Sequence, residues 1–360
     1  MMLLLLDEDF KICGTVEQYE SLVWRRRYFA VGSFTLTLPA AFFRQVSGAA
    51  YLFHPRNNET AVIESIDLTV DRSGKSSLSV SGRMLECLFE RRVIEDTARL
   101  SGGVGAAVNN LVRIYAMTHE RKIPYLRWLK ENSLNDTVNA QMTGVGLLEA
   151  LYTVLKPYQA SFSLTYNAEK NRLEFSAWKG LDRTQSQTEN GWAVFSTSLE
   201  NIAASAYSSN TAGYCNFAYV YGAEQDGVRP CATVDKTVNG QNRRELYVDA
   251  HDLKKTTVSD SGTETALTDE QYRQLLIRRG EEALERHAGE QCFTGALAQN
   301  AAPVYRVDYD LGDVVSLEDA ENGISAELRV TELIETWRDG GCRVDAVFGK
   351  KTPDSVWTVS

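Results

Sequence analysis

Residues 305–349 have the sequence YRVDYDLGDVVSLEDAENGISAELRVTELIETWRDGGCRVDAVFG, and this stretch gives the clearest indication of the fold. Apolar residues recur at every second position in two places: Ala326, Leu328 and Val330, and then Cys342, Val344, Ala346 and Phe348. Such an alternation is typical of strands with one face on a core and the other in water. Gly312-Asp313 and Asp339-Gly340-Gly341 supply turns,. The stretch predicts three or four antiparallel strands without a reactive cluster, which indicates a building block rather than a catalyst.

The N-terminal region shows the same period. Phe34, Leu36 and Leu38 alternate with serine and threonine. Strands are predicted over residues 3–10, 22–28, 33–39, 50–53, 60–71 and 77–81,. Closure or sandwiching of these strands would protect their edges. The sequence therefore predicts a β-dominated α+β fold.

The middle of the chain changes to helical spacing. Helices are predicted over residues 105–116 and 143–158, the second with Thr143 as N-cap and Pro157 as stop,. A hairpin over residues 162–177 follows,. Together these segments predict a compact α+β insertion between two β-rich regions.

Two further elements are predicted in the C-terminal half. Residues 216–222 are apolar on both faces, which predicts a central strand,. Residues 254–266 are polar and predict an exposed loop. Thr268-Asp269-Glu270-Gln271 then forms a capping-box pattern that opens a long helix over residues 268–289,.

Composition narrows the class of protein. The chain has 360 residues, of which 43% are hydrophobic and 24% charged, and this is ordinary for a globular protein,. A net charge of −10 argues against a protein whose main task is to grip nucleic acid, although acidic walls suit a surface past which DNA slides,. No apolar segment approaches the roughly 18 residues of a membrane span. The opening Met-Met-Leu-Leu-Leu-Leu precedes Asp7, Glu8 and Asp9, which favours a first strand over a signal peptide,.

Reactive residues give only weak signals. The six cysteines lack metal-ligand spacing and are interpreted as reduced thiols in the core of a protein made in the cytosol, with zinc and disulfide as the alternatives,. Asp308, Asp310 and Asp313 could serve as calcium ligands, but aspartates at this spacing more commonly belong to a turn and a strand edge,. A cysteine hydrolase would need Cys215 or Cys231 with His251 or His287, against the alternative of a buried thiol and exposed imidazoles,. Residues 102–105 (GGVG) suit a flexible helix entry better than a phosphate loop,. We therefore predict no catalytic residue, cofactor or metal.

A mixed aromatic and basic cluster is the one predicted interaction site. On a strand, Trp24, Arg26 and Tyr28 share one face, and Arg25 and Arg27 lie on the other,. These residue types anchor subunit interfaces, so the row is a candidate interface. Intrachain ion pairs and a solvated strand are the alternatives, as they are for Arg91-Arg92, Arg243-Arg244 and Arg278-Arg279,. Nucleic-acid binding is disfavoured by the acidity of the chain.

The order of these signals resembles the siphophage tail-hub family, which is related to baseplate hubs and prophage tail-tip proteins. The matching stretches are YESLVWRRRYFAVGSFTLTLP (19–39), LSVSGRMLECLFERRVI (78–94), LEFSAWKGLDRT (173–184), residues 194–222 ending in NFAYVYG, and LGDVV (311–315) with residues 330–349. The resemblance implies a homotrimeric ring that caps the tail tube. Each subunit would contribute two tube-like β-barrel domains and thereby match the hexameric tube.

The resemblance also implies a domain division. We expect an N-terminal β-barrel hub domain over residues 1–95, a helical insertion over 96–158, a small α+β hairpin domain over 159–200, a second barrel over 201–350 and a tail over 351–360. Many relatives continue into a hydrolase or a receptor-binding region. Such activities are expected on another polypeptide here, because the sequence ends soon after Gly349.

The expected function is structural and not enzymatic, at the distal tip of a virion tail made in the bacterial cytoplasm. The expected partners are further copies of the chain, the distal tail protein and tube ring, the tape-measure protein, and tip or fibre proteins. DNA would pass through the lumen without specific binding, and no membrane insertion is expected. The alternatives are a tail-associated cell-wall peptidase and a carbohydrate-binding module that uses Trp178, Trp192 or Trp337.

Overall fold

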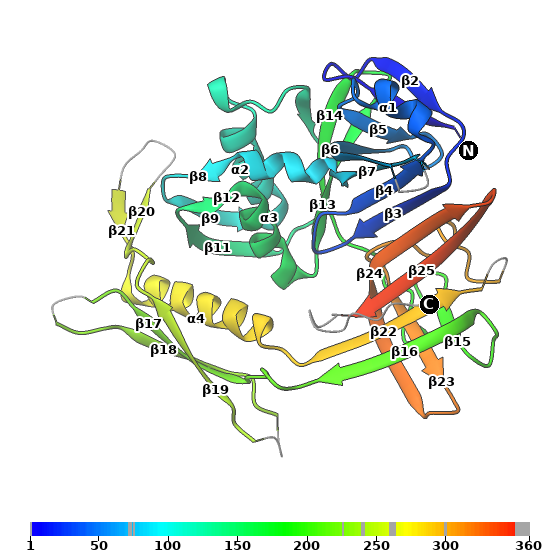
Figure 1. The fold of residues 1–360 in the computed structure, drawn as a ribbon. Coiled ribbons are helices and arrows are strands. Elements are labelled where there is room, and N and C mark those ends of the chain that lie inside the picture. Colours follow the sequence, from blue (N-terminus) through cyan, green and yellow to red (C-terminus); the bar gives the residue numbers. More distant parts are fainter. Residues whose placement is uncertain are drawn as a thin grey trace.

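The computed structural model describes residues 2–70, 74, 76–224, 227–238, 242–258, 264–298 and 301–349. The predicted tail over residues 351–360 lies outside the described residues. Strands dominate, with four α-helices among them, so the predicted β-dominated α+β class is confirmed (Figure 1).

One large sheet joins the two ends of the chain. Its strands are β1 (Leu3–Leu6), β2 (Ile12–Val16), β3 (Ser21–Arg27), β4 (Ser33–Leu38), β5 (Tyr51–His54), β6 (Glu59–Val70), β7 (Ser76–Met84), β16 (Ile202–Asn210), β22 (Glu290–Leu297), β24 (Ile324–Arg338) and β25 (Gly341–Gly349). The order across the sheet is β16-β22-β25-β24-β3-β4-β7-β6-β5-β1-β2. β23 (Val314–Asp319) joins through β24, and β15 (Val194–Ser196) pairs with β23. Within the described residues this path does not close on itself, and the two-barrel arrangement stays a prediction.

Two halves of this sheet repeat one topology. The first unit has the strands β3, β4, β6 and β7, which lie in the sheet in the order β3-β4-β7-β6. The fourth strand in sequence therefore lies between the second and the third. The strands β16, β22, β24 and β25 lie in the order β16-β22-β25-β24, which is the same permutation. Every neighbouring pair in both sets is antiparallel. The sheet therefore contains two four-strand units of the same connectivity.

The two units meet at β3 and β24, which lie side by side in Figure 1. These strands pair antiparallel from Arg27 opposite Glu332 to Ser21 opposite Arg338. Trp24 and Leu22 of β3 belong to the apolar core of the first unit. Leu333 of β24, on the same face, belongs to the core of the second. The two cores thus cover one face of a continuous sheet.

A helical region packs beside the first unit. It contains α2 (Val104–Ala116), α3 (Leu147–Leu155), β8 (Val93–Ile94), β9 (Ala98–Gly103), β10 (Leu126–Leu129), β11 (Thr137–Met142), β12 (Val145–Gly146), β13 (Ser161–Asn167) and β14 (Arg172–Trp178). One apolar cluster joins α2 and α3 to the β13–β14 hairpin, so side chains from both sides of the predicted boundary at residue 158 share a core. The domain division itself stays a prediction.

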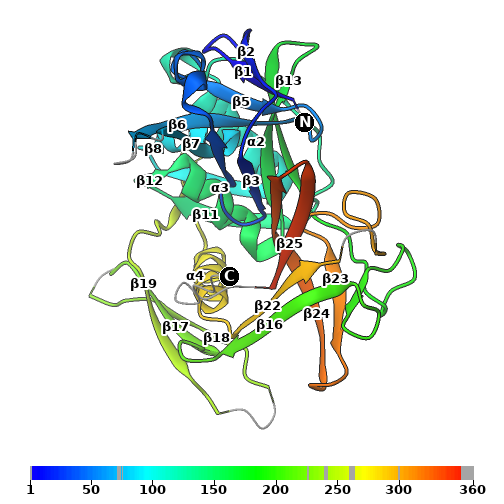
Figure 2. The same ribbon diagram turned by 45° about the vertical axis from the view of Figure 1, so that its right-hand side comes forward.

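A separate module contains the long helix. α4 (Asp269–Arg286) packs on one face of the sheet β18-β17-β19, whose strands are β18 (Cys231–Asp235), β17 (Phe217–Gly222) and β19 (Glu245–Ala250) (Figure 2). The capping box between Thr268 and Gln271 is confirmed, and so is β17 as a central strand. Gly280 of α4 allows the close approach, because a Cβ there would lie 2.6 Å from Val220 Cγ2.

Three local predictions were wrong. Helix α3 begins at Leu147 after Gly146, because the residues around Thr143 continue into the short strand β12. The polar stretch 254–266 contains the antiparallel strands β20 (Thr256–Val258) and β21 (Glu264–Ala266) instead of a loop. The long helix ends at Arg286, where β22 soon follows. The predicted strands of 305–349 are confirmed as β23, β24 and β25.

Candidate assembly site

The junction between the two units carries a buried ionic network. Arg26 of β3 forms an ion pair with Glu59 through Nε at 2.8 Å and donates a hydrogen bond from Nη1 to Asp310 at 2.5 Å. Its Nη1 also lies 2.9 Å from the hydroxyl of Tyr305. The side chain of Arg26 is only 17% exposed. A cation buried to this degree requires such partners, because its desolvation is costly.

Carboxylates and a second cation complete the network. Arg306 lies 3.1 Å from Glu59 and 3.2 Å from Glu335. Glu335 is 3% exposed, and it accepts hydrogen bonds from Asn57 Nδ2 and from the hydroxyl of Tyr305, each at 3.0 Å. The cluster therefore ties β24 and the 305–310 loop to β3 and the start of β6.

The ionised side chains in this cluster are stabilised by neighbouring groups of opposite charge. Burial opposes the charge on Arg26, but Glu59, Tyr305 and Asp310 outweigh it and hold the pKa of Arg26 well above its ordinary value,. Burial also raises the pKa of Glu335, yet the hydrogen bond from Asn57 and the charge of Arg306 bring it below its ordinary value. Both groups are therefore ionised at neutral pH, and the network acts as a set of salt bridges.

A buried histidine lies against the same network. The ring of His54 lies 5.2 Å from Trp24 and 6.0 Å from Trp337, and its side chain is fully buried. Nδ1 accepts a hydrogen bond from the backbone of Asn57, whereas Nε2 has no hydrogen-bond partner within the described structure. Burial lowers the pKa of His54, so the ring is neutral in the folded protein,.

The opposite face of the junction is exposed and also charged. Arg25 and Arg27 both contact Glu332 of β24, at 3.0 and 3.3 Å. Each side chain of these arginines is about one third exposed, so the pairs contribute much less than a buried pair,. The intrachain ion pairs considered for this basic cluster are therefore present.

The predicted row Trp24, Arg26 and Tyr28 lies on one face, as expected, but each member has a role within the chain. Trp24 is fully buried and donates from Nε1 to Glu59 at 2.6 Å. Tyr28 is fully buried, and its hydroxyl donates to the carbonyl of Gln159 at 3.0 Å. The row holds the two units and the helical region together. Its use as an interface between subunits stays a prediction.

The partners of Arg26 were missed by the sequence reasoning. Glu59, Tyr305 and Glu335 belong to separate elements, and Tyr305 is 279 positions away from Arg26. No local spacing relates such residues. The isolated charges inside otherwise apolar strands, such as Glu335 beside Trp337, were the one available signal.

The remaining reactive residues do not converge. Asp308 accepts from Val304 N, and Asp313 accepts from Leu181 N and Arg183 Nε, which are turn and strand-edge contacts. No group of three metal-binding side chains occurs in the described part of the chain. The residues 102–105 end β9 and start α2.

Cys215 and His287 are neighbours, because the backbone N–H of Cys215 donates to the carbonyl of His287 at 3.0 Å, but the Cys215 thiol donates to the carbonyl of Glu245 at 3.8 Å. His287 Nδ1 lies 3.1 Å from the carbonyl oxygen of Gly213, and His251 Nδ1 lies 3.2 Å from Asp249. None of the six cysteines forms a disulfide, but the predicted core position is wrong for Cys13 and Cys231, which are exposed, while Cys215 is partly buried. The arrangement shows no thiol–imidazole pair among the described residues.

The other surface candidates are dispersed. Trp192 is 57% exposed, whereas Trp178 packs on Tyr28 and Trp337 is buried. Arg243 stacks 3.5 Å from the ring centroid of Phe217, and Arg279 pairs with Asp252. Arg243 and Arg279 therefore make these contacts within the chain.

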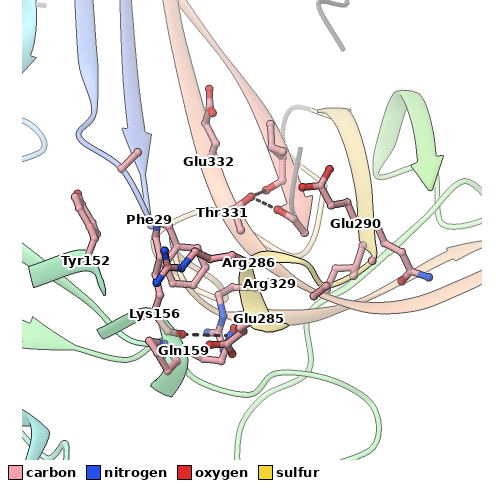
Figure 3. Close-up of a pocket in the computed structure, with 18 of the residues that line it drawn as sticks. Phe29, Tyr152, Lys156, Gln159, Glu285, Arg286, Glu290, Arg329, Thr331 and Glu332 are labelled. Carbon is pink, nitrogen blue, oxygen red and sulfur yellow. Dashed lines mark hydrogen bonds between the residues drawn. The ribbon is translucent and has the colours of Figure 1, made fainter. Parts of the chain in front are cut away.

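A cleft of about 1120 Å³ lies between the helical region, α4 and the second unit. Figure 3 shows Lys156 after α3, Glu285 and Arg286 from the end of α4, and Arg329 and Glu332 from β24 around it. Burial raises the pKa of Glu285 and lowers that of Arg329. Its lining residues include charges of both signs but neither cysteine nor histidine among those described. The described lining of the cleft therefore does not supply the thiol and imidazole of a cysteine hydrolase,.

This fold is shared with solved phage tail proteins. The tail protein from Neisseria meningitidis MC58 has a TM-score of 0.59 and 14% identity, covering 97% of this chain and 96% of that chain. Prophage tail protein gp18 from Listeria monocytogenes EGD-e has a TM-score of 0.60 and 11% identity, covering 98% and 95%. The 43 kDa tail protein of prophage MuSo2 from Shewanella oneidensis has a TM-score of 0.57 and 10% identity, covering 97% of both. The fold class is that of phage tail proteins.

The sequence places the chain within a family. Residues 2–350 match the model of the Siphovirus ReqiPepy6 Gp37-like proteins, and the chain belongs to that family. The predicted relationship with siphophage tail proteins is confirmed at this level. No curated protein sequence matches the chain. Among the described helices, none has the combined length and apolarity of a membrane crossing.

Proposed function

We propose that this protein is a structural subunit at the distal end of a phage tail, where copies of it form a ring that caps the tail tube. The observation that carries the proposal is the duplicated four-strand unit, joined edge to edge through β3 and β24. Two similar units per chain allow three chains to present six units to a hexameric tube. Membership of a siphophage family supports the same location.

The chemistry of the chain suits a scaffold through which DNA passes. The net charge of −10 disfavours adhesion of DNA,. The exposed sheet face carries serine and threonine on β4 and β7 and paired charges such as Arg25–Glu332. The tube ring, the distal tail protein, the tape-measure protein and tip or fibre proteins are the proposed neighbours.

A structural role is favoured over catalysis by the separation of reactive groups. The imidazole of His251 contacts Asp249, and that of His287 contacts the carbonyl of Gly213, so neither ring is bonded to a thiol among the described residues. A muropeptide digest tests this directly. We expect no release of peptides, and cleavage that is lost in Cys215→Ala or His251→Ala would contradict the structural role.

The oligomeric state tests the ring. One chain has a mass of 40.2 kDa. We expect mass photometry and light scattering of the purified protein to give the mass of three chains, and electron micrographs to show rings. A stable single chain across a wide concentration range, with no ring in the presence of tube protein, would overturn the proposal.

A further inference from the structure

The α4 module has an aromatic face that no described element covers. Phe217, Tyr219 and Tyr221 occupy alternate positions of β17, and on β19 the register partner of Tyr219 is Tyr247. Val220 packs in the core beneath α4, so the rings lie on the other side of the sheet,. In Figures 1 and 2 no described helix or strand lies over that side. We propose that this surface, called the tyrosine face, binds a neutral polysaccharide.

The outermost ring of the tyrosine face is open on one side. Tyr247 stacks on Tyr221 with ring centroids 5.3 Å apart and 23° between the ring planes. Although Tyr221 covers one side of the ring, the Tyr247 side chain is still 60% exposed, and β19 is an outer strand of the sheet. The C–H groups on one side of a sugar ring pack well on the electron-rich face of an aromatic ring. The open side of Tyr247 is therefore the expected stacking position for a sugar.

An ion pair beside this ring supplies groups that bind hydroxyls. Arg229 donates from Nη1 to the hydroxyl oxygen of Tyr247 at 3.1 Å and from Nη2 to Asp249 at 2.6 Å. Because the oxygen of Tyr247 accepts from the guanidinium, its own proton can be donated to a ligand. The carboxylate of Asp249 has further lone pairs that accept from sugar hydroxyls, and hydrogen bonds to charged groups are strong ones.

Arg243 repeats this arrangement at the other end of the tyrosine face. Its guanidinium lies 3.5 Å from the ring centroid of Phe217, which is consequently only 7% exposed. Nη2 donates to the hydroxyl of Tyr219 at 2.6 Å, and Nε pairs with Glu245 at 2.8 Å. At both ends an arginine, a carboxylate and a tyrosine are thus held together before any ligand arrives. Such preorganisation lowers the entropic cost of binding.

The charges of the tyrosine face favour a neutral ligand. Arg229 and Arg243 each pair with a carboxylate, and Asp235 of β18 adds another opposite Phe217. Nucleic acid is disfavoured, because its phosphates need cations that are not already neutralised. An apolar peptide would remove water from the two ion pairs without replacing its hydrogen bonds, which is costly. Sugar hydroxyls replace those hydrogen bonds, so a polysaccharide fits both the rings and the ion pairs.

Polysaccharide binding would be a property of the single chain, separate from the proposed ring. The probes are linear oligosaccharides of β-linked glucose and of β-linked N-acetylglucosamine, titrated into the full chain by calorimetry. Poly-L-proline and oligothymidylate serve as probes for the peptide and nucleic-acid classes. We expect at least one oligosaccharide to bind and neither of the other probes.

Substitutions at Tyr247 test the stacking position. Tyr247→Ala should weaken oligosaccharide binding about tenfold, because it removes the ring on which the sugar packs. Tyr247→Phe keeps that ring and should retain most of the affinity. Trp192→Ala is the matched control, since Trp192 is 57% exposed and lies outside the α4 module, and it should bind like the wild type. Circular dichroism confirms that each variant is folded.

A second measurement locates the ligand on the unsubstituted chain. Hydroxyl-radical oxidation followed by peptide mass spectrometry should slow at Tyr247 when the oligosaccharide is present. Tyr207 of β16 is 40% exposed and serves as the internal reference, because it lies outside the tyrosine face and should be oxidised as before. The ratio of the two rates corrects for radicals consumed by the sugar.

Several results would overturn the assignment. Failure of both oligosaccharides to bind at millimolar concentration would do so, and so would binding that is lost in Trp192→Ala but kept in Tyr247→Ala. Binding of poly-L-proline or oligothymidylate alone would assign the face to another class of partner. If Tyr247→Ala does not fold, the oxidation of Tyr247 in the wild-type chain decides, and lack of protection there contradicts the proposal.

Discussion

Arg26 and Glu59 form a buried ion pair at 2.8 Å beside the β3–β24 junction, where the two four-strand units of the sheet meet. Both side chains are less than one fifth exposed. The pair connects the strand that joins the units to β6 of the first unit, and Arg306 binds the same carboxylate from the 305–310 loop. The junction is thus held by charges within a mostly apolar sheet.

Breaking this pair should strongly destabilise the chain. Arg26→Met leaves the carboxylates of Glu59 and Asp310 short of a cation, and removal of one partner of a buried pair costs about 3–5 kcal/mol,. We expect a loss of this size in the free energy of unfolding from urea titrations followed by fluorescence of the buried Trp24. Arg25→Met is the control, because its pair with Glu332 is more exposed and should contribute about 0–1 kcal/mol,. Equal losses in the two variants would contradict a special role for Arg26.

The junction should weaken in mild acid through His54. Burial lowers its pKa in the folded protein, so the unfolded chain takes up the proton first as the pH falls below the ordinary value of about 6.5,. Stability is therefore complete above that pH and declines below it, by at most about 1.4 kcal/mol for each pH unit. Unfolding measured at about pH 7.5 and about pH 5.5 should show this loss, and His54→Phe should reduce it.

Gly280 should control the packing of α4. A side chain there meets Val220 Cγ2 and Val234 Cγ2, for which the Cβ separations would be 2.6 and 2.7 Å. Gly280→Leu overpacks this contact and should cost about 1–3 kcal/mol, despite the better helix propensity of leucine. Limited proteolysis should then cut the β17–β19 module faster than the main sheet. Gln274→Leu, on the exposed side of the same helix, should show no such increase.

The N-terminus of α4 should depend on its capping box. The hydroxyl of Thr268 accepts from the backbone of Gln271 at 3.2 Å, and the side chain of Gln271 accepts from the backbone of Thr268 at 2.9 Å. Thr268→Ala should cost about 1 kcal/mol, because one orphan donor of the first turn loses its partner. Thr268→Ser keeps the acceptor and should be nearly neutral. Hydrogen exchange at Gln271 and Tyr272 reports the difference locally.

Local patterns were sufficient for much of the fold. The alternation in β24 and β25, the hairpin β13–β14 and the capping box of α4 were all predicted, since each depends on residues close in sequence. The strands of 254–266 and the start of α3 were not, because partner strands overrode polar composition and an apparent N-cap at Thr143. Propensity is a weak guide where tertiary pairing competes with it.

The assembly site was predicted only in part. The sequence placed Trp24, Arg26 and Tyr28 on one face of a strand, because side chains alternate along any strand. It could not identify Glu59, Asp310 or Glu335 as their neighbours. Those contacts arise when β24 pairs with β3, and the partners of Arg26 include residues 279 and 284 positions away.

The sequence alone predicted the β-rich class, many of the strands, the capping box of α4 and the siphophage family relationship, because these are recorded in short-range periodicity and in the order of motifs. Only the three-dimensional fold shows that the two ends of the chain share one sheet, that its halves repeat one strand order, and that β16 and the distal part of β6 each have one side without a partner strand among the described residues. Strand pairing between distant segments depends on the packing of the whole core, and no local pattern specifies which edge meets which.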